Sequence, residues 1–573
     1  MPKRLTPVVF AFGFLIWIAL MAGCAQKTEP ADLVVTNGKI VTMDASLPVA
    51  EALAARAGKI VELASAKKIQ RYIGPATQVI DLGGTLAVPG LIDAHVHFTG
   101  IGQAKLILDL TKAKNWDEIV AMVAEAVKKA KAGEWISGRG WHQEKWDKAP
   151  EPNVNGLPTH AALSRVSPNY PVVLTHASGY SSLANAKAMQ LAGITAKTPN
   201  PRGGEIIKDA KGNPIGAFLE TAQGLLRGPM GKDLDARTPE EKEAERVKII
   251  ELADQECLSK GLTSVHDAGT GWDTITLYKQ LIDQGKLGVR MNAMLSTSNA
   301  ELKARAAEYK LTGYGNDHLT VRSIKRIMDG ALGPHGAWLL EPYADLPAST
   351  GLNTTPVDQI RETATIAIEN GFQLCVHAIG DRANRETLNI FEEAFKAHPD
   401  KKDVRWRVEH AQHLSLPDIP RFGQLGAIAS MQGIHCTSDG PWVLKRLGPQ
   451  RAEEGAYVWR KLMSTGALIC NGTDAPVEDV DPLPVFYASV TRKMKNGEFF
   501  YPDQKMTREE ALKSYTLNAA YAAFQEDIKG SLTPGKLADI TVISKDIMTC
   551  PEDEILGARV TATIVGGKVL YKR

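Results

Sequence analysis

The sequence predicts an α/β protein: a TIM-type (β/α)8 barrel with a small composite β-sandwich domain built from both termini and an insertion after the first barrel strand. Eight apolar runs each end in a polar or small residue, and most are followed by a helix-like stretch. Short strand-like segments lie at both ends of the chain, and an unusually long gap separates the first two runs. The 573 residues, 44% of them hydrophobic, suffice to bury a core of this size.

The first 23 residues are expected to form a signal peptide. Lys3 and Arg4 precede an apolar stretch over 8–21 that is shorter than a comfortable membrane span. The following Ala22-Gly23-Cys24 resembles the lipobox of bacterial lipoproteins, in which the signal is cleaved and the cysteine is acylated. We expect lipidation at Cys24, a polar tether over 24–31, and anchoring on the periplasmic side, at the outer membrane. A simple signal peptide or an N-terminal anchor helix is the alternative.

Export would place the remaining cysteines in an oxidising compartment. They are odd in number and widely spread: Cys257, Cys375, Cys436, Cys470 and Cys550. We expect separate buried thiols and no disulfide framework.

The N-terminal part of the mature chain contains short strands. The runs 33–36 and 39–42 flank Asn37-Gly38, the strongest short hairpin signal. We therefore expect a β-hairpin here, within a segment over 32–85.

The C-terminus has the same character. The runs 561–565 and 568–571 flank Gly566-Gly567, and another strand-like run covers 539–543. An isolated hairpin is marginal in water. We therefore expect residues 528–573 to pair with the N-terminal segment in one small β-domain.

The barrel is expected over 86–527. Its strands are predicted at the runs 87–95, 263–267, 289–295, 324–329, 373–377, 406–410, 427–431 and 468–474. The gap after the first strand is far longer than a normal βα connection, so we assign about 100–235 to an inserted subdomain over the barrel mouth. Two strand-like runs, 135–138 and 171–174, lie inside it.

Helix starts support this plan. Asn115 with Glu118 predicts a capping box that opens an amphipathic helix to Lys131, and Thr507 with Glu510 predicts a second one.

The strongest chemical signal is His95-Val96-His97 at the end of the first barrel strand. Alternation along a strand turns both imidazoles to one side, where they can share a metal. Such a pair is expected by chance roughly 0.3 times in a chain with this histidine content, so a core or solvated pair is the alternative. The Pro89-Gly90 turn, the apolar lead-in and Asp93 make the motif more specific.

Four further candidate ligands follow later strands. They are Lys325, His377, His410 and Asp474, at or near the ends of the fourth, fifth, sixth and eighth predicted strands. Barrel enzymes build their sites from the C-terminal ends of several strands. The topology therefore predicts that these side chains meet His95 and His97 at one mouth.

The chain resembles the amidohydrolase superfamily, in the branch of N-substituted formamide deformylases, from about Leu33 to Tyr571. Besides the candidate ligands, the resemblance includes Gly138-Arg139-Gly140-Trp141, Gly203-Gly204-Glu205-Ile206, Glu341-Pro342-Tyr343, Gly530-Ser531-Leu532 and Gly535-Lys536-Leu537-Ala538-Asp539. It implies a metal-dependent hydrolase that acts on carbon–nitrogen bonds other than peptide bonds.

The resemblance also implies a divalent metal centre, with two zinc ions per chain. His95 and His97 would bind the buried metal, a carboxylated Lys325 would bridge both metals, His377 and His410 would hold the second, and Asp474 would complete the site. A carbamate on Lys325 would be stabilised by the two cations. The alternative is a mononuclear site with Lys325 as a structural salt-bridge partner.

The expected reaction uses metal-activated water. The metal would lower the pKa of bound water to about 7 and polarise the substrate carbonyl. Asp474 would take the proton from water and pass it to the leaving nitrogen. The alternative for Asp474 is a plain ligand role, which is compatible with the first.

Substrate recognition is less clearly encoded. Ser178-Gly179-Tyr180 stands where the branch usually has a Gly-His pair, and Pro334-His335 where it has an Arg. Candidates for the pocket wall, each with a structural role as the alternative, are Trp141, His176, Tyr180, His335, His435 and Asp439.

Composition limits the partners. With 67 basic and 65 acidic residues the chain has no field that would attract nucleic acid, so we expect a small-molecule amide substrate and leave the oligomeric state open. Alternatives to amide or N-formyl hydrolysis are a cyclic-amide or N-acyl-amino-acid hydrolase on the same scaffold, or a non-catalytic periplasmic binding lipoprotein. All six candidate ligands are present, which argues against the last.

Overall fold

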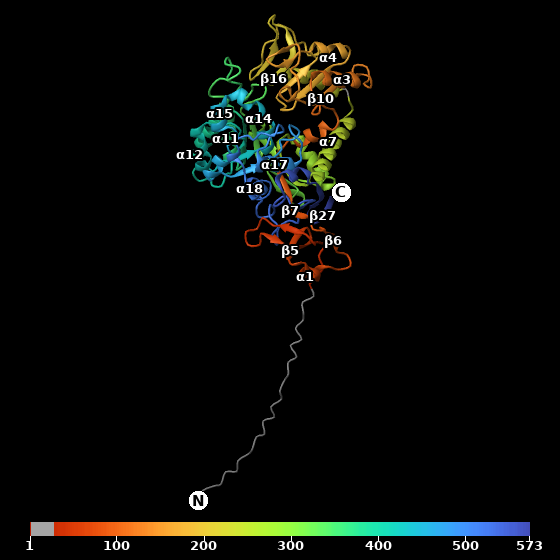
Figure 1. Ribbon diagram of the computed structural model, residues 1–573, viewed down its shortest axis with the longest axis vertical. Helices are drawn as coiled ribbons and strands as arrows, with labels where there is room; N and C mark the ends of the chain where they lie inside the picture. Colours follow the sequence, from red (N-terminus) through yellow and green to blue (C-terminus); the bar gives the residue numbers. More distant parts are fainter. Residues whose placement is uncertain (2–27, 236) are drawn as a thin grey trace.

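The computed structural model describes residues 1, 28–235 and 237–573. The expected signal peptide, Cys24 and the start of the tether lie outside these residues. Figure 1 shows three parts: the inserted region with β10 (Ile136–Trp141) and β16 (Pro214–Glu220) at one end, the helices of the barrel in the middle, and sheets from both termini at the other end.

The barrel consists of eight parallel strands, as predicted. In spatial order they are β8 (Leu91–Val96), β17 (Leu262–Thr270), β18 (Arg290–Leu295), β20 (Leu319–Ile327), β21 (Gln373–Ala378), β22 (Arg407–His410), β23 (Ile428–Met431) and β24 (Ile469–Asn471). The ring closes just beyond β24, where Asp474 N donates to His95 O and His97 N donates to Ala475 O, both at 2.8 Å. The strand ends therefore face one mouth.

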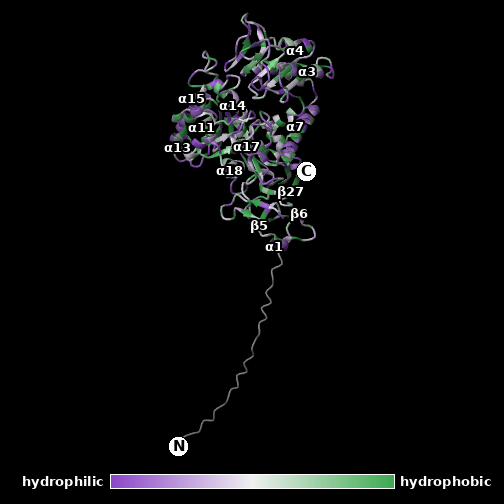
Figure 2. Ribbon diagram, viewed as in Figure 1, coloured by the Kyte–Doolittle hydropathy of each residue, from purple (hydrophilic) through white to green (hydrophobic). Residues whose placement is uncertain are grey.

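Helices surround these strands. They are α2 (Phe98–Ala104), α7 (Pro239–Ser259), α8 (Trp272–Asp283), α9 (Asn299–Tyr309), α11 (Val357–Glu369), α12 (Asp381–Ala397), α13 (Ile419–Leu425), α14 (Gly433–Leu447), α15 (Pro449–Gly455), α16 (Trp459–Ser464), α17 (Pro482–Thr491), α18 (Arg508–Ser514) and α19 (Leu517–Ala522). In Figure 2 the ribbons of outer helices such as α11, α13 and α15 carry many hydrophilic residues, as expected of amphipathic helices on a buried sheet.

The first predicted barrel strand is in fact two strands. Residues Leu86–Pro89 (β7) pair with the terminal strands β2 and β25, and only β8 joins the barrel. Gly90 separates them, and a Cβ there would lie 2.2 Å from Thr263 Oγ1. One continuous apolar run thus passes from one sheet into another, which hydrophobicity alone cannot reveal.

Strands from both termini form two further sheets. One orders β5 (Lys59–Ala64), β4 (Ala52–Arg56), β1 (Leu33–Thr36) and β6 (Gln78–Asp81); the other orders β27 (Lys568–Lys572), β26 (Val560–Val565), β25 (Ile540–Ile543), β7, β2 (Lys39–Val41) and β3 (Val49–Ala50). Buried side chains of both sheets share one core, including Leu33, Leu53, Ile540 and Ile564. The predicted C-terminal hairpin is confirmed as β26–β27.

The predicted N-terminal hairpin is wrong. Strands β1 and β2 flank Asn37-Gly38 but belong to different sheets, so they do not pair. Asn37 has a φ of 61°, and a Cβ on Gly38 would lie 2.5 Å from Leu82 Cβ. The turn therefore carries the chain from one sheet of the sandwich to the other.

The insertion contains its own six-stranded sheet, ordered β15 (Gly204–Lys208), β16, β14 (Ser181–Ala184), β13 (Val172–His176), β10 and β9 (Leu108–Asp109). Both strand-like runs predicted inside it are confirmed as β10 and β13. The helices α3 (Trp116–Val127), α4 (Ala161–Val166), α5 (Ala186–Leu191) and α6 (Gly224–Asp235) accompany the sheet.

Both predicted helix starts are found. Asn115 accepts from Glu118 N and caps α3, which ends at Val127 and not at Lys131. Glu118 returns its side chain to Lys114 N, one residue before the position of a true capping box. Thr507 and Glu510 form the complete box at α18.

The later cysteines are free thiols, four buried and Cys550 partly buried. Across residues 28–235 and 237–573, no helix combines the length and the apolar character that a membrane span needs.

Candidate functional site

The six predicted ligands lie together at the barrel mouth. Asp474 Oδ1 is 3.1 Å from His97 Nε2 and 3.6 Å from His95 Nε2. Lys325 Nζ is 3.3 Å from His95 Nε2. The ring centroid of His410 lies 4.3 Å from that of His377 and 4.8 Å from that of His95. Five strands thus bring distant side chains into one cluster, buried except for His97.

Unusual backbone conformations position two of them. His410 has a φ of 75°, Ala411 of 44° and Asp474 of 58°. Left-handed conformations of such residues cost about 1–3 kcal/mol and cluster at functional sites. They turn the chain sharply where β22 and β24 end, so His410 leaves the alternation of its strand.

Asp93 ties the first barrel strand to the last. Its carboxylate accepts hydrogen bonds from His95 N at 3.0 Å, from Thr473 N at 3.1 Å and from Thr473 Oγ1 at 2.6 Å. Burial nevertheless raises the pKa of Asp93 to about 7. Asp93 therefore fixes the backbone next to both His95 and Asp474.

A second layer of contacts orients three imidazoles. His95 Nδ1 bonds the Glu409 carboxylate, which also accepts from Arg407 Nε at 2.6 Å. His410 Nδ1 lies 2.7 Å from Gln432 Oε1, and His377 Nδ1 lies 3.1 Å from the hydroxyl of Tyr180. In each ring Nδ1 is engaged. His95 Nε2 faces Lys325 and Asp474, whereas His377 Nε2 lies 3.5 Å from Asp329 Oδ1.

This pattern is that of metal-binding histidines, whose second nitrogen is held by an outer partner. Burial, the largest cause, lowers the pKa of His95 to about 4 and those of His377 and His410 well below the usual value. The three rings are therefore neutral near pH 7, with lone pairs available to a cation.

The site favours the neutral form of Lys325 and the ionised form of Asp474. Burial lowers the pKa of Lys325, which favours the neutral amine that reacts with CO₂. Burial opposes ionisation of Asp474, but neighbouring His97, His410 and His95 outweigh it and hold its pKa well below the usual range. Asp474 is therefore a carboxylate at neutral pH.

The cluster fits a metal. His95, His97 and Asp474 offer ligand atoms within 4.8 Å of one another, and so do His410, His435 and Asp474. Within the described chain, neither the buried His377 Nε2 nor the buried Asp474 Oδ1 is in a well-aligned hydrogen bond, although Asp329 Oδ1 lies 3.5 Å from the first and His97 Nε2 3.1 Å from the second. Unsatisfied buried groups are rare, and mixed imidazole and carboxylate donors suit zinc and similar divalent ions.

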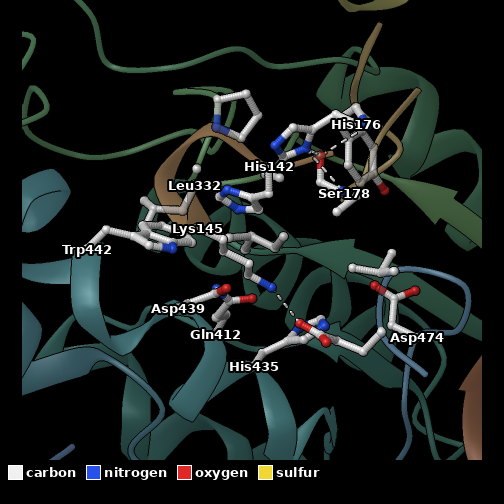
Figure 3. Close-up of a pocket in the computed structure, with 18 residues that line it drawn as sticks. His142, Lys145, His176, Ser178, Leu332, Gln412, His435, Asp439, Trp442 and Asp474 are labelled. Atoms are coloured by element: carbon white, nitrogen blue, oxygen red, sulfur yellow. Dashed lines mark hydrogen bonds and ion pairs between the residues drawn. The ribbon is translucent and has the colours of Figure 1, made fainter. Parts of the chain in front are cut away.

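A narrow pocket of about 40 Å³ opens beside Asp474. Its wall includes four of the predicted recognition residues, His176, Tyr180, His435 and Asp439. In the view of Figure 3, Asp474 lies at one end of the pocket and Trp442 with Asp439 at the other. Residues of the insertion and of the barrel thus share this wall.

Two predicted recognition residues lie elsewhere. Trp141 is fully buried in the core of the insertion, with Nε1 donating to Leu174 O at 2.9 Å, because its side chain packs under the sheet. His335 faces a different cavity and bonds Asp345 at 3.1 Å. Neither lines the pocket beside Asp474.

Sequence analysis also missed residues that support the site. Glu409, Arg407 and Gln432 were not assigned any role. Arg407 and Glu409 are charged residues two apart in the strand Arg-Val-Glu-His, and both are fully buried. That pattern was the available signal, since buried charges need partners.

Known proteins resemble this chain over most of its length. The family model described as the Amidohydrolase family matches residues 78–571. LONG AFTER FAR-RED 3 of Arabidopsis thaliana is 34% identical, and the match covers 97% of this chain and 94% of the plant protein. An N-substituted formamide deformylase of Arthrobacter pascens is 26% identical, and the match covers 95% of this chain and 99% of the deformylase.

A solved structure has the same architecture. The uncharacterized metal-dependent hydrolase from Pyrococcus furiosus is 26% identical with a TM-score of 0.69, covering 90% of this chain and all of that one (100%). Since the family model and the relatives span nearly the whole described chain, this protein is a hydrolytic enzyme that belongs to the amidohydrolase family.

Proposed function

We propose that the protein hydrolyses an amide or N-formyl-type C–N bond in a small molecule, with a divalent metal centre at the barrel mouth. The observation that carries this proposal is the close cluster of His95, His97, Lys325, His377, His410 and Asp474 at the barrel mouth. The deformylase from Arthrobacter supports the bond type.

We propose that the site holds two zinc ions. His95 and His97 would hold one, His377 and His410 the other, with Asp474 completing the site and a carboxylated Lys325 between them. When bound, the metals supply Lewis-acid activation of water and of the substrate carbonyl. The lowered pKa of Lys325 supports the carbamate, since only a neutral amine attacks CO₂.

Asp474 would move the proton. The water oxygen forms a bond to the carbonyl carbon, and the Asp474 carboxylate accepts the proton released from that water. The C–N bond then breaks as Asp474 returns the proton to the leaving nitrogen, giving a carboxylic acid and an amine. Asp474 suits this task because its lowered pKa keeps it ionised at neutral pH and because it lies in the cluster, 3.1 Å from His97 and 3.6 Å from His95.

The test combines elemental analysis with hydrolysis assays. We expect two metals per chain in wild type, and a loss of kcat of roughly 10²- to 10⁴-fold in Asp474→Asn. Asp479→Asn is the matched control, because Asp479 lies on the same loop but pairs with Lys260 at 3.4 Å. Full activity in Asp474→Asn would exclude the proton transfer, and no metal in active wild type would exclude the centre.

We also propose that the protein is exported and held at the outer membrane by a lipid on Cys24. The basic residues, apolar stretch and lipobox-like end of segment 1–24 support this. Cells fed a palmitate analogue should label wild type but not Cys24→Ser. Labelling of the variant, or recovery of unlabelled wild type in the cytoplasmic fraction, would contradict the anchor.

A further inference from the structure

A second cavity adjoins the narrow pocket. It measures about 530 Å³, within the range of small-molecule sites. Its wall combines β10 of the insertion, helices α2 and α7 of the barrel, and the loop 475–480 that follows Asp474. Both cavities share Lys145, Ala177, Val477 and Glu478 as lining residues. The larger cavity therefore meets the pocket next to the proposed proton carrier.

Arg139 lines this larger cavity, and its positive charge has no carboxylate partner among the described residues. Its Nη2 donates to Ala177 O at 3.0 Å and its Nε to Pro476 O at 3.5 Å. No carboxylate of residues 28–235 or 237–573 forms an ion pair with it, and Nη1 has no hydrogen-bond partner there. Burial lowers the pKa of Arg139, against the pull of the Asp474 charge.

The other charges of this wall are mostly engaged. Lys105 pairs with Glu256 at 3.0 Å, Lys145 with Glu478 at 2.9 Å (Figure 3), and Asp479 with Lys260 at 3.4 Å. Asp109 accepts from the Thr111 hydroxyl at 2.6 Å. Lys495 is exposed. Arg139 is thus the partly buried cation of this wall without an anionic partner.

Five arginines of the described chain are buried, whereas Arg139 is partly buried. Arg290, Arg407 and Arg446 each pair with a carboxylate, and Arg326 has no carboxylate in this part of the chain but donates to Thr363, Asn299 and the Lys325 carbonyl. Arg492 has none, but it donates to two backbone carbonyls and lies 4.5 Å from the Trp459 ring, fully enclosed. A partly buried guanidinium that faces a cavity is better stabilised when an anion joins it.

We propose that Arg139 binds a carboxylate of the substrate, so that the enzyme acts on N-acylated amino acids and not on uncharged amides. This rests on the proposed function. The Nε of Arg139 donates to the carbonyl of Pro476, which is two residues after Asp474 in the chain. A substrate carboxylate bound to Nη1 would therefore place the neighbouring amide bond of the substrate beside Asp474. A charge-assisted hydrogen bond of this kind corresponds to roughly 10- to 100-fold in affinity.

The test uses substrates that differ only in the carboxylate. The zinc-loaded full chain is assayed with N-formyl- and N-acetyl-phenylalanine, both enantiomers, and with N-formyl- and N-acetyl-phenethylamine. We expect wild type to prefer the acids by roughly 10- to 100-fold in kcat/KM. Arg139→Gln should lose that preference through KM and keep its rate on the phenethylamides, while Arg139→Lys keeps part of the preference. Lys105→Gln, which removes a paired charge from the same cavity, should leave the preference unchanged.

Binding provides a readout without turnover. Titration calorimetry with 3-phenylpropionate should show binding to wild type that Arg139→Gln weakens by roughly 10- to 100-fold, while 3-phenylpropanamide binds both alike. The proposal would be overturned if wild type hydrolysed the acids and the phenethylamides with equal kcat/KM, or if Arg139→Gln lost kcat/KM equally on both. It would also be overturned if wild type and Arg139→Gln bound 3-phenylpropionate equally. No hydrolysis of any compound would overturn both the proposed function and the proposed substrate class, while the binding arm would still decide separately whether Arg139 holds a carboxylate. Preference for inorganic phosphate over the carboxylate in the same titration would count against it as well.

Discussion

At the residue scale, three of the imidazoles are oriented by side chains from other segments: His95 by Glu409, His377 by Tyr180 and His410 by Gln432. Gln432 gives the clearest case, because its Nε2 donates to Ser430 O and thereby turns Oε1 toward His410 Nδ1. That bond selects the tautomer whose Nε2 has a free lone pair.

Gln432→Met should weaken metal binding without removing a ligand. The variant keeps the side-chain volume but loses the acceptor, so we expect a fall in metal affinity of roughly 10- to 100-fold. Chelator competition followed by elemental analysis measures it, and thermal melting of the metal-free protein controls for folding. Gln432→Glu retains an acceptor and should recover part of the affinity. Unchanged affinity in Gln432→Met would argue against the orienting role.

At the element scale, helix α2 begins at Phe98, directly after His97, and packs tightly on α7. The contact depends on Gly102, where a Cβ would lie 1.8 Å from Ile249 O. Backbone cannot yield as a flexible side chain can. The close packing of α2 on α7 therefore requires glycine at position 102, and this packing also places His97, which directly precedes α2.

Gly102→Ala should push α2 away from α7. We expect a loss of about 1–3 kcal/mol in the free energy of unfolding, the usual cost of overpacking, together with a lower metal content. Urea denaturation measures the first quantity. Gly224→Ala is the control, since Gly224 is helical with a φ of −57° and open space around its Cβ position. A stability equal to wild type would mean that the helices can separate without cost.

At the scale of the whole molecule, one buried ion pair joins the barrel to the terminal sheets. Arg290 at the start of β18 donates Nε and Nη2 to Asp539 at 2.8 and 3.1 Å, and Asp539 also accepts from Gly566 N at 2.7 Å. Burial raises the pKa of Asp539, but Arg290 outweighs it and the net shift is downward. A carboxylate with a depressed pKa stabilises the fold above its unfolded pKa of about 4, and this is lost as the pH falls through the lower folded value.

Asp539→Asn should therefore destabilise the protein most above pH 4. Removing one partner of a buried pair typically costs about 3–5 kcal/mol, and the difference from wild type should shrink below pH 4 as Asp539 protonates. Melting temperatures from pH 3 to 7 test this. Glu29→Gln removes a mostly exposed partner of Arg56 and should change little at any pH. A difference that is constant with pH would contradict the assignment.

The clustering of the candidate site could be predicted because its candidate ligands follow strand ends. His95, His97, Lys325, His377, His410 and Asp474 come at or near the ends of apolar runs, and parallel strands in a barrel end at one mouth. The direction of side chains off the strands could not be predicted. Trp141 and His335 were expected in the pocket, yet one packs under the sheet of the insertion and the other faces away.

The sequence alone determined the fold class and which candidate metal ligands meet at the barrel mouth, because apolar periodicity and motif spacing are local properties of the chain. Pairing between distant segments was decided only by the tertiary structure. The strand after Asn37-Gly38 joins the sheet of β7 and not that of its neighbour β1, Glu409 orients His95 from across the barrel, and Arg139 lacks a counter-charge. Each depends on which surfaces come together once the chain is folded, and no local pattern records that.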